Sequence, residues 1–174
     1  GALGVALLIW YQLLDNPRQA RGDDLQRGSL LGSRFDDAEI RAVLERSGTP
    51  HEYIAGDEAL CERVASEIEA GKVVGWFQGA MEFGPRALGA RSIIGDPRRP
   101  DMQSTINVKV KFREGFRPFA PAVLEEHAGE YFDATGSQPS PYMLLVTPVR
   151  AEKRRELGVE EKEATGIDKL KQWR

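Results

Sequence analysis

The residues that could do chemistry gather between Lys72 and Arg117. This segment carries nine Lys/Arg and four Asp/Glu, a net charge of +5, whereas the rest of the 174-residue chain has 15 and 23, a net charge of −8. Six aromatic rings alternate with the cations: Trp76, Phe77, Phe83, Phe112, Phe116 and Phe119. Cations gathered beside flat apolar walls are suited to holding an anion, and phosphate is the anion we expect first.

The densest group of cations lies in KVKFREGFRPF, residues 109–119. In an extended chain its three leading cations share one side and the apolar residues between them face the core: Lys109, Lys111 and Arg113 against Val110 and Phe112. Pro118 and Pro121 stiffen the continuation and hold Arg117 in place. The pattern predicts a polyphosphate site, and a solvated amphipathic strand with inert lysines is the open alternative.

A second candidate segment is GAMEFGPRALGARS, Gly79–Ser92. Its glycines, Gly84 among them, could let backbone N–H groups approach an anion, while Arg86 and Arg91 offer planar bidentate donors. Glu82 could orient an arginine, take part in Mg²⁺ binding or offset charge. The alternative is a Gly-rich turn with surface arginines.

Other kinds of site are excluded or disfavoured. The phosphate-binding pattern GxxxxGK[ST] is absent, and His51 and His127 have no motif around them, so we expect no protein metal site. Cys61, the one cysteine, is expected in the core; it excludes an intrachain disulfide and suits a reducing, cytoplasmic compartment. Any catalysis would therefore rest on positioned cations that stabilise phosphate charge.

The elements that must position these residues alternate between helix and strand, which predicts an α/β (α+β) domain on a twisted sheet. Helices are expected at 2–14, from Asp36 or Asp37 to Gly48, from a capping Asp57 to Gly71, at 86–89 after Pro85, from a capping Asp101 to about 110, and at 125–131. Strands are expected at 51–55, 73–78 (buried on both faces), 92–95, 119–124 and 142–149.

The N-terminal fourteen residues are almost wholly apolar, too few to span a bilayer and without the basic flank of a signal peptide. We expect a buried helix that ends at Asn16-Pro17. Residues 15–33 are polar and Gly-rich, which predicts a connector with a domain boundary. The abrupt ends suggest a piece of a longer protein.

Two stretches, GWFQGAMEFGPRALGARSIIGDPR and INVKVKFREGFRPFAPAVLEE, resemble the carbamoyltransferase family of the NodU and antibiotic O-carbamoyltransferase type. The resemblance covers about fifty contiguous positions and extends more loosely over residues 1–149. It implies that 1–33 end a sugar-kinase/actin-like domain, and that 34–174 form a YrdC-like domain with a twisted mixed sheet flanked by helices, cut short at its C-terminus.

In this family the YrdC-like domain takes carbamoyl phosphate and ATP, with Mg²⁺ on the nucleotide, and makes carbamoyladenylate; the preceding domain passes the carbamoyl group to a hydroxyl of a sugar, antibiotic or nodulation factor. The resemblance implies phosphate-binding roles in KFREGFRPFA. The candidate catalytic residues are Lys111, Arg113, Arg117 and Glu82, and the candidate substrate- or nucleotide-binding residues are Arg86, Arg91, Ser92, Lys109, Asn107 and Gly84. Family members continue beyond the equivalent of Arg174, so we expect this chain alone to lack full turnover.

Two other functions stay open. YrdC-like folds also serve tRNA modification, so the basic groove could hold RNA, although the confined +5 favours a small polyphosphate over a long nucleic-acid backbone. The chain could also be an inactive packing module for another domain. We expect no membrane partner, and a homodimer is possible because the first helix is apolar.

Overall fold

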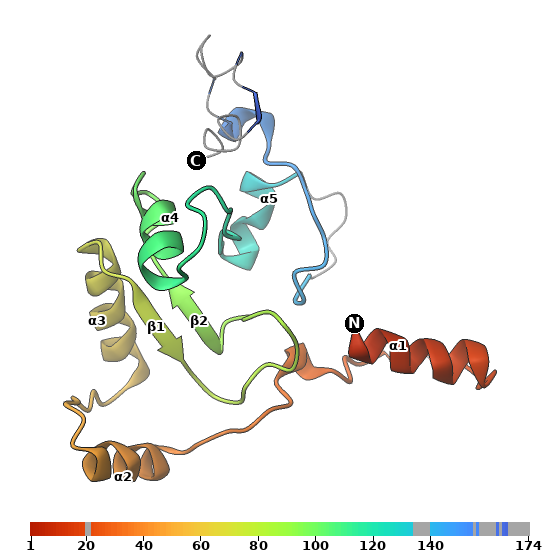
Figure 1. Ribbon diagram of the computed structural model, residues 1–174, viewed down its shortest axis with the longest axis horizontal. Helices are drawn as coiled ribbons and strands as arrows, with labels where there is room; N and C mark the ends of the chain where they lie inside the picture. The colour runs from red at the N-terminus through yellow and green to blue at the C-terminus, as the bar shows by residue number, and fades with distance from the viewer. Residues whose placement is uncertain (20–21, 134–139, 155, 157–162, 164, 167–174) are drawn as a thin grey trace.

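The computed structural model describes residues 1–19, 22–133, 140–154, 156, 163, 165 and 166 (Figure 1). Its α-helices are α1 (Ala2–Leu8), α2 (Asp37–Ser47), α3 (Asp57–Glu69), α4 (Met102–Thr105) and α5 (Ala128–Tyr131), and its strands are β1 (Val74–Phe77) and β2 (Arg91–Ile94). Helical turns of other types lie at Ile9–Leu13, Arg27–Ser29, Ile106–Val110, Glu125–His127 and Ala151–Lys153. Helices with a small sheet confirm the mixed α/β class.

The sheet of the described residues is an antiparallel ribbon in which Val74 lies opposite Ile94 and Phe77 opposite Arg91. Along β1 half-buried and exposed residues alternate, so the prediction of a strand buried on both faces was wrong. Residues 51–55 and 119–124 form no strand, and 142–149 contribute only an isolated bridge from Val149 to Phe132. An apolar run becomes a strand only where another segment of the chain lies beside it and completes its backbone hydrogen bonds.

The two long helices begin and end where the sequence predicted. Asp36 caps α2 in a reciprocal capping box with Glu39, and Gly48 ends the helix in the left-handed conformation at φ 64°. In α3 the N-cap is Gly56 rather than Asp57, which lies in the first turn where its negative charge favours the helix dipole. Gly71, at φ 84°, follows its last turn.

The N-terminal helix is present but is not buried. Helix α1 continues into a π-helical turn, Ile9–Leu13, and Leu7, Trp10 and Leu14 are each about half exposed or more. Figure 1 shows α1 standing apart from the ribbon and from the other helices. In the described part of the chain, no helix combines the length and apolar content needed to cross a bilayer.

The core lies where α4 packs on the end of β2. Met102 and Ile106 are 5% and 6% exposed, and a Cβ on Gly95 would lie 2.7 Å from the sulfur of Met102. This close approach favours glycine after β2, because a Cβ there would displace the Met102 and Ile106 side chains that seat the helix. The packing of Met102 against Gly95 therefore fixes the orientation of this helix, and with it the direction of the side chains on its other faces.

The connector makes direct contact with the loop between β1 and β2. The amide of Gly32 donates to the carbonyl of Met81 at 2.9 Å, the amide of Met81 donates to Ser33 at 2.9 Å, and the amide of Phe83 donates to Ser29 at 2.6 Å. Ser29 is 2% exposed. Residues 29–33 are therefore docked onto residues 81–83, although sequence reasoning treated them as a linker.

Candidate anion-binding site

The cations at 109–113 do not lie on an extended strand. Lys109 is in the π-helical turn Ile106–Val110, Lys111 ends that turn, and Phe112 reverses the chain with a left-handed φ of 50°. Phe112 is 86% exposed, so the prediction that it faces the core was wrong. The helix continues this far because Met102 and Ile106 anchor its other side, and tertiary packing overrides the alternating pattern.

Asn107 is the centre of the loop that follows. Its side chain is fully buried, and its amide nitrogen donates to the carbonyls of Gly115 at 3.3 Å and Arg117 at 2.8 Å. Its amide oxygen accepts the Nε–H of Arg113 at 2.6 Å. Asn107 was predicted to bind nucleotide directly; a buried amide with these three partners instead holds protein groups.

Arg113 is held on two sides. Its Nε–H is bonded to Asn107, and its guanidinium carbon lies 5.0 Å from the centroid of the Phe119 ring. Within the described residues, its two terminal nitrogens make no hydrogen bond or ion pair. A guanidinium fixed through Nε and one face retains the paired N–H donors that match two oxygens of a phosphate or carboxylate.

Arg117 is already paired. Its Nε–H donates to Glu114 at 2.8 Å, and both side chains are about half exposed. The Arg117 side-chain bond holds the pKa of Glu114 below its ordinary value.

The carbonyl of Arg117 also accepts from Gln103 at 3.0 Å, so Gln103 and Asn107, one helical turn apart, hold the same loop. The i, i+4 spacing of these two amides was the missed signal.

Glu82 organises the second candidate segment. One carboxylate oxygen accepts the backbone N–H groups of Leu88, Ala90 and Arg91 at 2.8, 2.6 and 3.3 Å. Partial burial raises the pKa of Glu82, but these N–H groups and its own outweigh burial and hold the pKa below 4.5. The carboxylate thus takes up backbone donors that sequence reasoning offered to an anion.

Arg91 is occupied through its terminal nitrogens, whereas its buried Nε has no hydrogen-bond partner among the described residues. Its terminal nitrogens donate to the carbonyls of Gln78 at 3.0 Å, Gly79 at 2.9 Å and Ala90 at 2.7 Å, and its guanidinium carbon lies 3.2 Å from the centroid of the Phe77 ring. The side chain ties the loop back to the end of β1. Its observed contacts are therefore structural.

The other predicted residues of this loop differ in exposure and contact. Ser92 accepts the N–H of Gly89 at 3.2 Å, and Gly84 is exposed with φ 127°. Arg86 is exposed, and the helical turn predicted at 86–89 does not form: Arg86 and Gly89 are bends with irregular chain between them, and the Glu82 carboxylate takes up the amide of Leu88. The loop leaves one end of β2 and α4 follows the other, so Arg86 and Arg113 lie on segments that leave opposite ends of the strand (Figure 1).

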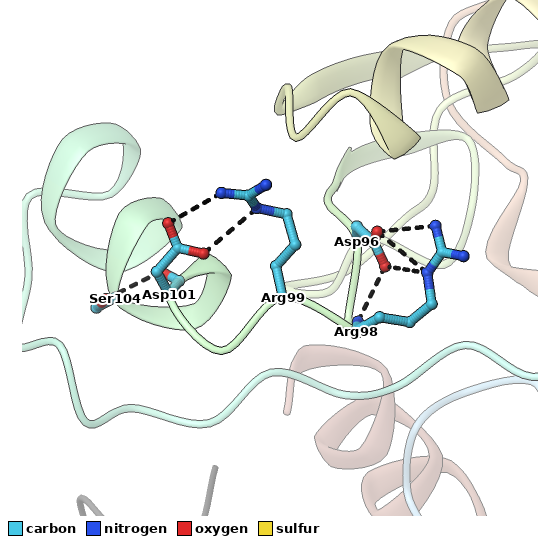
Figure 2. A network of polar contacts seen from close by, with 5 residues as sticks. All are labelled: Asp96, Arg98, Arg99, Asp101 and Ser104. Atoms are coloured by element: carbon cyan, nitrogen blue, oxygen red, sulfur yellow. Dashed lines mark hydrogen bonds and ion pairs between the residues drawn. The ribbon is translucent and has the colours of Figure 1, made fainter.

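The remaining basic residues of the segment face local acids. Figure 2 shows Arg98 gripping the buried carboxylate of Asp96, with Nε 2.9 Å from Oδ1, and Arg99 paired with Asp101 at 3.3 Å. Asp101, the predicted cap of α4, makes no side-chain cap bond; its backbone lies in the αR region, whereas a capping residue ordinarily has extended backbone angles. Lys72 pairs with Glu67. Carboxylate partners are absent, among the described residues, for five of the nine cations: Arg86, Arg91, Lys109, Lys111 and Arg113.

No metal centre emerges from the residues that the structure covers: no three His, Cys, Asp or Glu side chains gather as a metal site would need. Cys61, predicted in the core, is exposed on α3 because Leu60, Val64 and Ile68 form the inward face. The candidate site is thus the loop at 111–117 with the helix that holds it.

Comparison with known proteins decides the family. Residues 65–164 match the family model described as Carbamoyltransferase C-terminus. This chain belongs to the carbamoyltransferase family. The match covers both candidate segments, from Glu82 to Arg117, and confirms the resemblance drawn from their sequences.

Several curated relatives are similar over nearly the whole chain. An uncharacterized protein of Synechocystis sp. (strain ATCC 27184 / PCC 6803 / Kazusa) is 53% identical over 98% of this chain and 28% of its own length. The nodulation protein NolNO of Sinorhizobium fredii is 44% identical over 90% of this chain and 23% of its own length, and NolO of Bradyrhizobium diazoefficiens is 40% identical over 90% and 28%. The chain spans about a quarter of the length of these relatives.

Proposed function

We propose that this chain is the part of an O-carbamoyltransferase that binds carbamoyl phosphate and ATP and forms carbamoyladenylate. Membership of the carbamoyltransferase family supports transfer chemistry. The observation that carries the proposal is the half-buried Arg113 guanidinium, held through Nε and by Phe119, whose terminal donors make no hydrogen bond to the described residues. We propose further that the acceptor is a hydroxyl brought by another domain of the longer protein.

Both substrates are phosphate compounds. In the proposed sequence water releases inorganic phosphate from carbamoyl phosphate, and an oxygen of the resulting carbamate then attacks the α-phosphorus of ATP and displaces pyrophosphate, so that carbamoyladenylate, phosphate and pyrophosphate are the products. The charge that develops on the leaving oxygens is stabilised by fixed cations and needs no base-activated nucleophile. Arg113 supplies a planar pair of donors, and the exposed Lys109 and Lys111, which precede it in the chain, supply mobile point charges. A rigid arginine together with flexible lysines suits a polyphosphate whose position changes during the reaction.

Mg²⁺ fits this scheme as a companion of the nucleotide. It commonly keeps several waters and binds through substrate phosphates with one or two protein carboxylates. We propose that the ion is carried by ATP rather than by a protein cage. One oxygen of Glu82 holds three backbone N–H groups, which favours a structural role for this carboxylate over coordination of the ion.

The test is calorimetric titration of ATP and of carbamoyl phosphate into the whole chain at low salt. Arg113→Ala should weaken nucleotide binding by about 1.5 to 3 kcal/mol, the worth of a hydrogen bond to a charged group. Arg41→Ala, which removes a cation on α2, is the matched control and should change binding little. Saturable heat from neither ligand, or tight salt-sensitive binding of RNA in their place, would contradict the proposal.

A further inference from the structure

We infer that Asn107 is a positioning residue that presets the Arg113 guanidinium for a phosphate-class anion, with Phe119 as the backing face. This inference rests on the proposed function in that it gives the same loop the same class of ligand. It adds two residues that do not themselves touch the anion. Asn107 was expected to bind substrate or nucleotide; in this arrangement its side chain is fully buried and its partners are protein groups.

The bonding of Asn107 has a fixed sense. Its two N–H groups face the carbonyl oxygens of Gly115 and Arg117, which leaves its amide oxygen toward the Nε–H of Arg113. If the amide nitrogen and oxygen of Asn107 were exchanged, its oxygen would face the two carbonyl oxygens and its N–H groups would face the Nε–H of Arg113, and neither contact is a hydrogen bond. The two loop carbonyls therefore orient the amide, and the amide orients the arginine.

The backbone reinforces this relay. The amide of Arg113 donates to the carbonyl of Asn107 at 3.0 Å, because the left-handed Phe112 turns the chain back over the helix. Arg113 is thus bonded to Asn107 through both main chain and side chain. An arginine restrained in this way loses less conformational entropy when it binds an anion than one that is mobile before binding.

Gln103 provides a built-in comparison. It lies one helical turn before Asn107 and donates to the carbonyls of Phe116 and Arg117 at 3.2 and 3.0 Å, but it makes no bond to the Arg113 side chain. Losing either amide loosens the loop. Only the loss of Asn107 also releases Arg113, which separates positioning from general support.

The first measurement needs no ligand. In NMR spectra of the whole chain, the Nε–H proton of Arg113 should exchange with water at least about ten-fold more slowly than that of the exposed Arg86, because a hydrogen bond must open first. Asn107→Leu should abolish this protection and Gln103→Leu should retain it. Equal exchange of Arg113 and Arg86 in the wild-type chain overturns the inference.

The second measurement is binding of inorganic pyrophosphate by calorimetry, arranged as a double-mutant cycle. Asn107→Leu should weaken binding about ten-fold, and the loss should shrink below about two-fold when Arg113 is already alanine. Gln103→Leu should weaken binding less than about three-fold. A loss from Asn107→Leu that is unchanged in the Arg113→Ala background, or that Gln103→Leu equals, shows that Asn107 only supports the loop and overturns the inference.

Phe119→Leu serves if Asn107→Leu does not fold, since it keeps an apolar side chain but removes the flat face beneath the guanidinium. It should weaken pyrophosphate binding about three-fold, and only when Arg113 is present; an equal loss in both backgrounds overturns the inference. A wild-type chain that does not bind pyrophosphate also overturns it. Pyrophosphate binding with this coupling, but no binding of ATP or carbamoyl phosphate, would instead leave the inference standing and refute the proposed function.

Discussion

Glu114 holds Arg117 by a 2.8 Å bond from the arginine Nε–H to a carboxylate oxygen. The pair lies in the loop that carries Arg113, so the same five-residue stretch contains a restrained cation and a cation whose charge is offset. An anion that recruits Arg117 must compete with Glu114. The loop therefore presents fewer uncompensated positive charges to an anion than its amino-acid composition indicates.

Glu114→Gln should strengthen pyrophosphate binding about two- to five-fold, because it removes the competing carboxylate from an exposed ion pair. The measurement is calorimetry at low salt. Glu126→Gln makes the same charge change at an exposed position outside the loop and should have a smaller effect. Equal gains from both variants would show a general charge effect with no release of Arg117.

Glu82→Gln should lower the free energy of unfolding by about 1 to 2 kcal/mol at pH 7, because charge-assisted bonds to three backbone N–H groups become neutral ones. The pKa of Glu82 is lowered in the folded chain, so its stabilisation is present above about pH 4.5 and is lost as pH falls through the lower folded value. Urea unfolding of both chains at several pH values should show the difference shrinking below pH 4.5. A difference that persists unchanged at the lowest pH would contradict this account.

Gly32→Ala should undock the connector from the loop. A Cβ at Gly32 would lie 2.7 Å from the Cβ of Met81 and 2.9 Å from its carbonyl oxygen, and neither atom can move without the backbone. Hydrogen exchange of the Gly32, Met81 and Phe83 amides should accelerate at least about ten-fold. Gly22→Ala, where nothing lies within 4 Å of the new carbon, should leave those amides protected.

Helix α1 should promote self-association of this chain, since it exposes adjoining apolar side chains that include Leu3, Leu7 and Trp10. Sedimentation at increasing concentration should show a species heavier than a monomer, and Leu7→Lys should shift the equilibrium toward monomer. Leu25→Lys changes an exposed leucine of the connector and is the control. Monomers at every concentration would remove the homodimer expectation.

Local signals predicted the helices well. Asp36 and Gly48 bound α2 because a capping box and a left-handed glycine act within a few residues, and the chain needs no distant partner to form them. β1 and β2 were also found, because Gly and Pro separate two apolar runs. Residues 119–124 failed as a strand: an apolar run does not say whether another chain segment will pair with it.

The contacts of the candidate site were also predictable only where the partners are close in sequence. Partners two or three positions apart, such as Asp96 with Arg98 and Glu114 with Arg117, could have been predicted from spacing alone. The bond from Arg113 to Asn107 could not, because it depends on the chain reversal at Phe112, a residue type that rarely adopts positive φ. The helix predicted from Asp101 to about residue 110 is present, with Met102 and Ile106 buried on it, whereas the competing prediction of an extended, alternating chain over 109–113 was wrong.

The docking of residues 29–33 on residues 81–83 has a mechanical consequence. Three backbone hydrogen bonds join Ser29, Gly32 and Ser33 of the connector to the loop that contains Glu82. Tension applied through the connector would therefore act on this loop before it acts on the β1–β2 ribbon. Pulled apart by optical tweezers from residue 1 and residue 124, the chain should yield first at this contact, in a small early step. In Gly32→Ala that step should vanish while rupture of the β1–β2 ribbon stays at its original force.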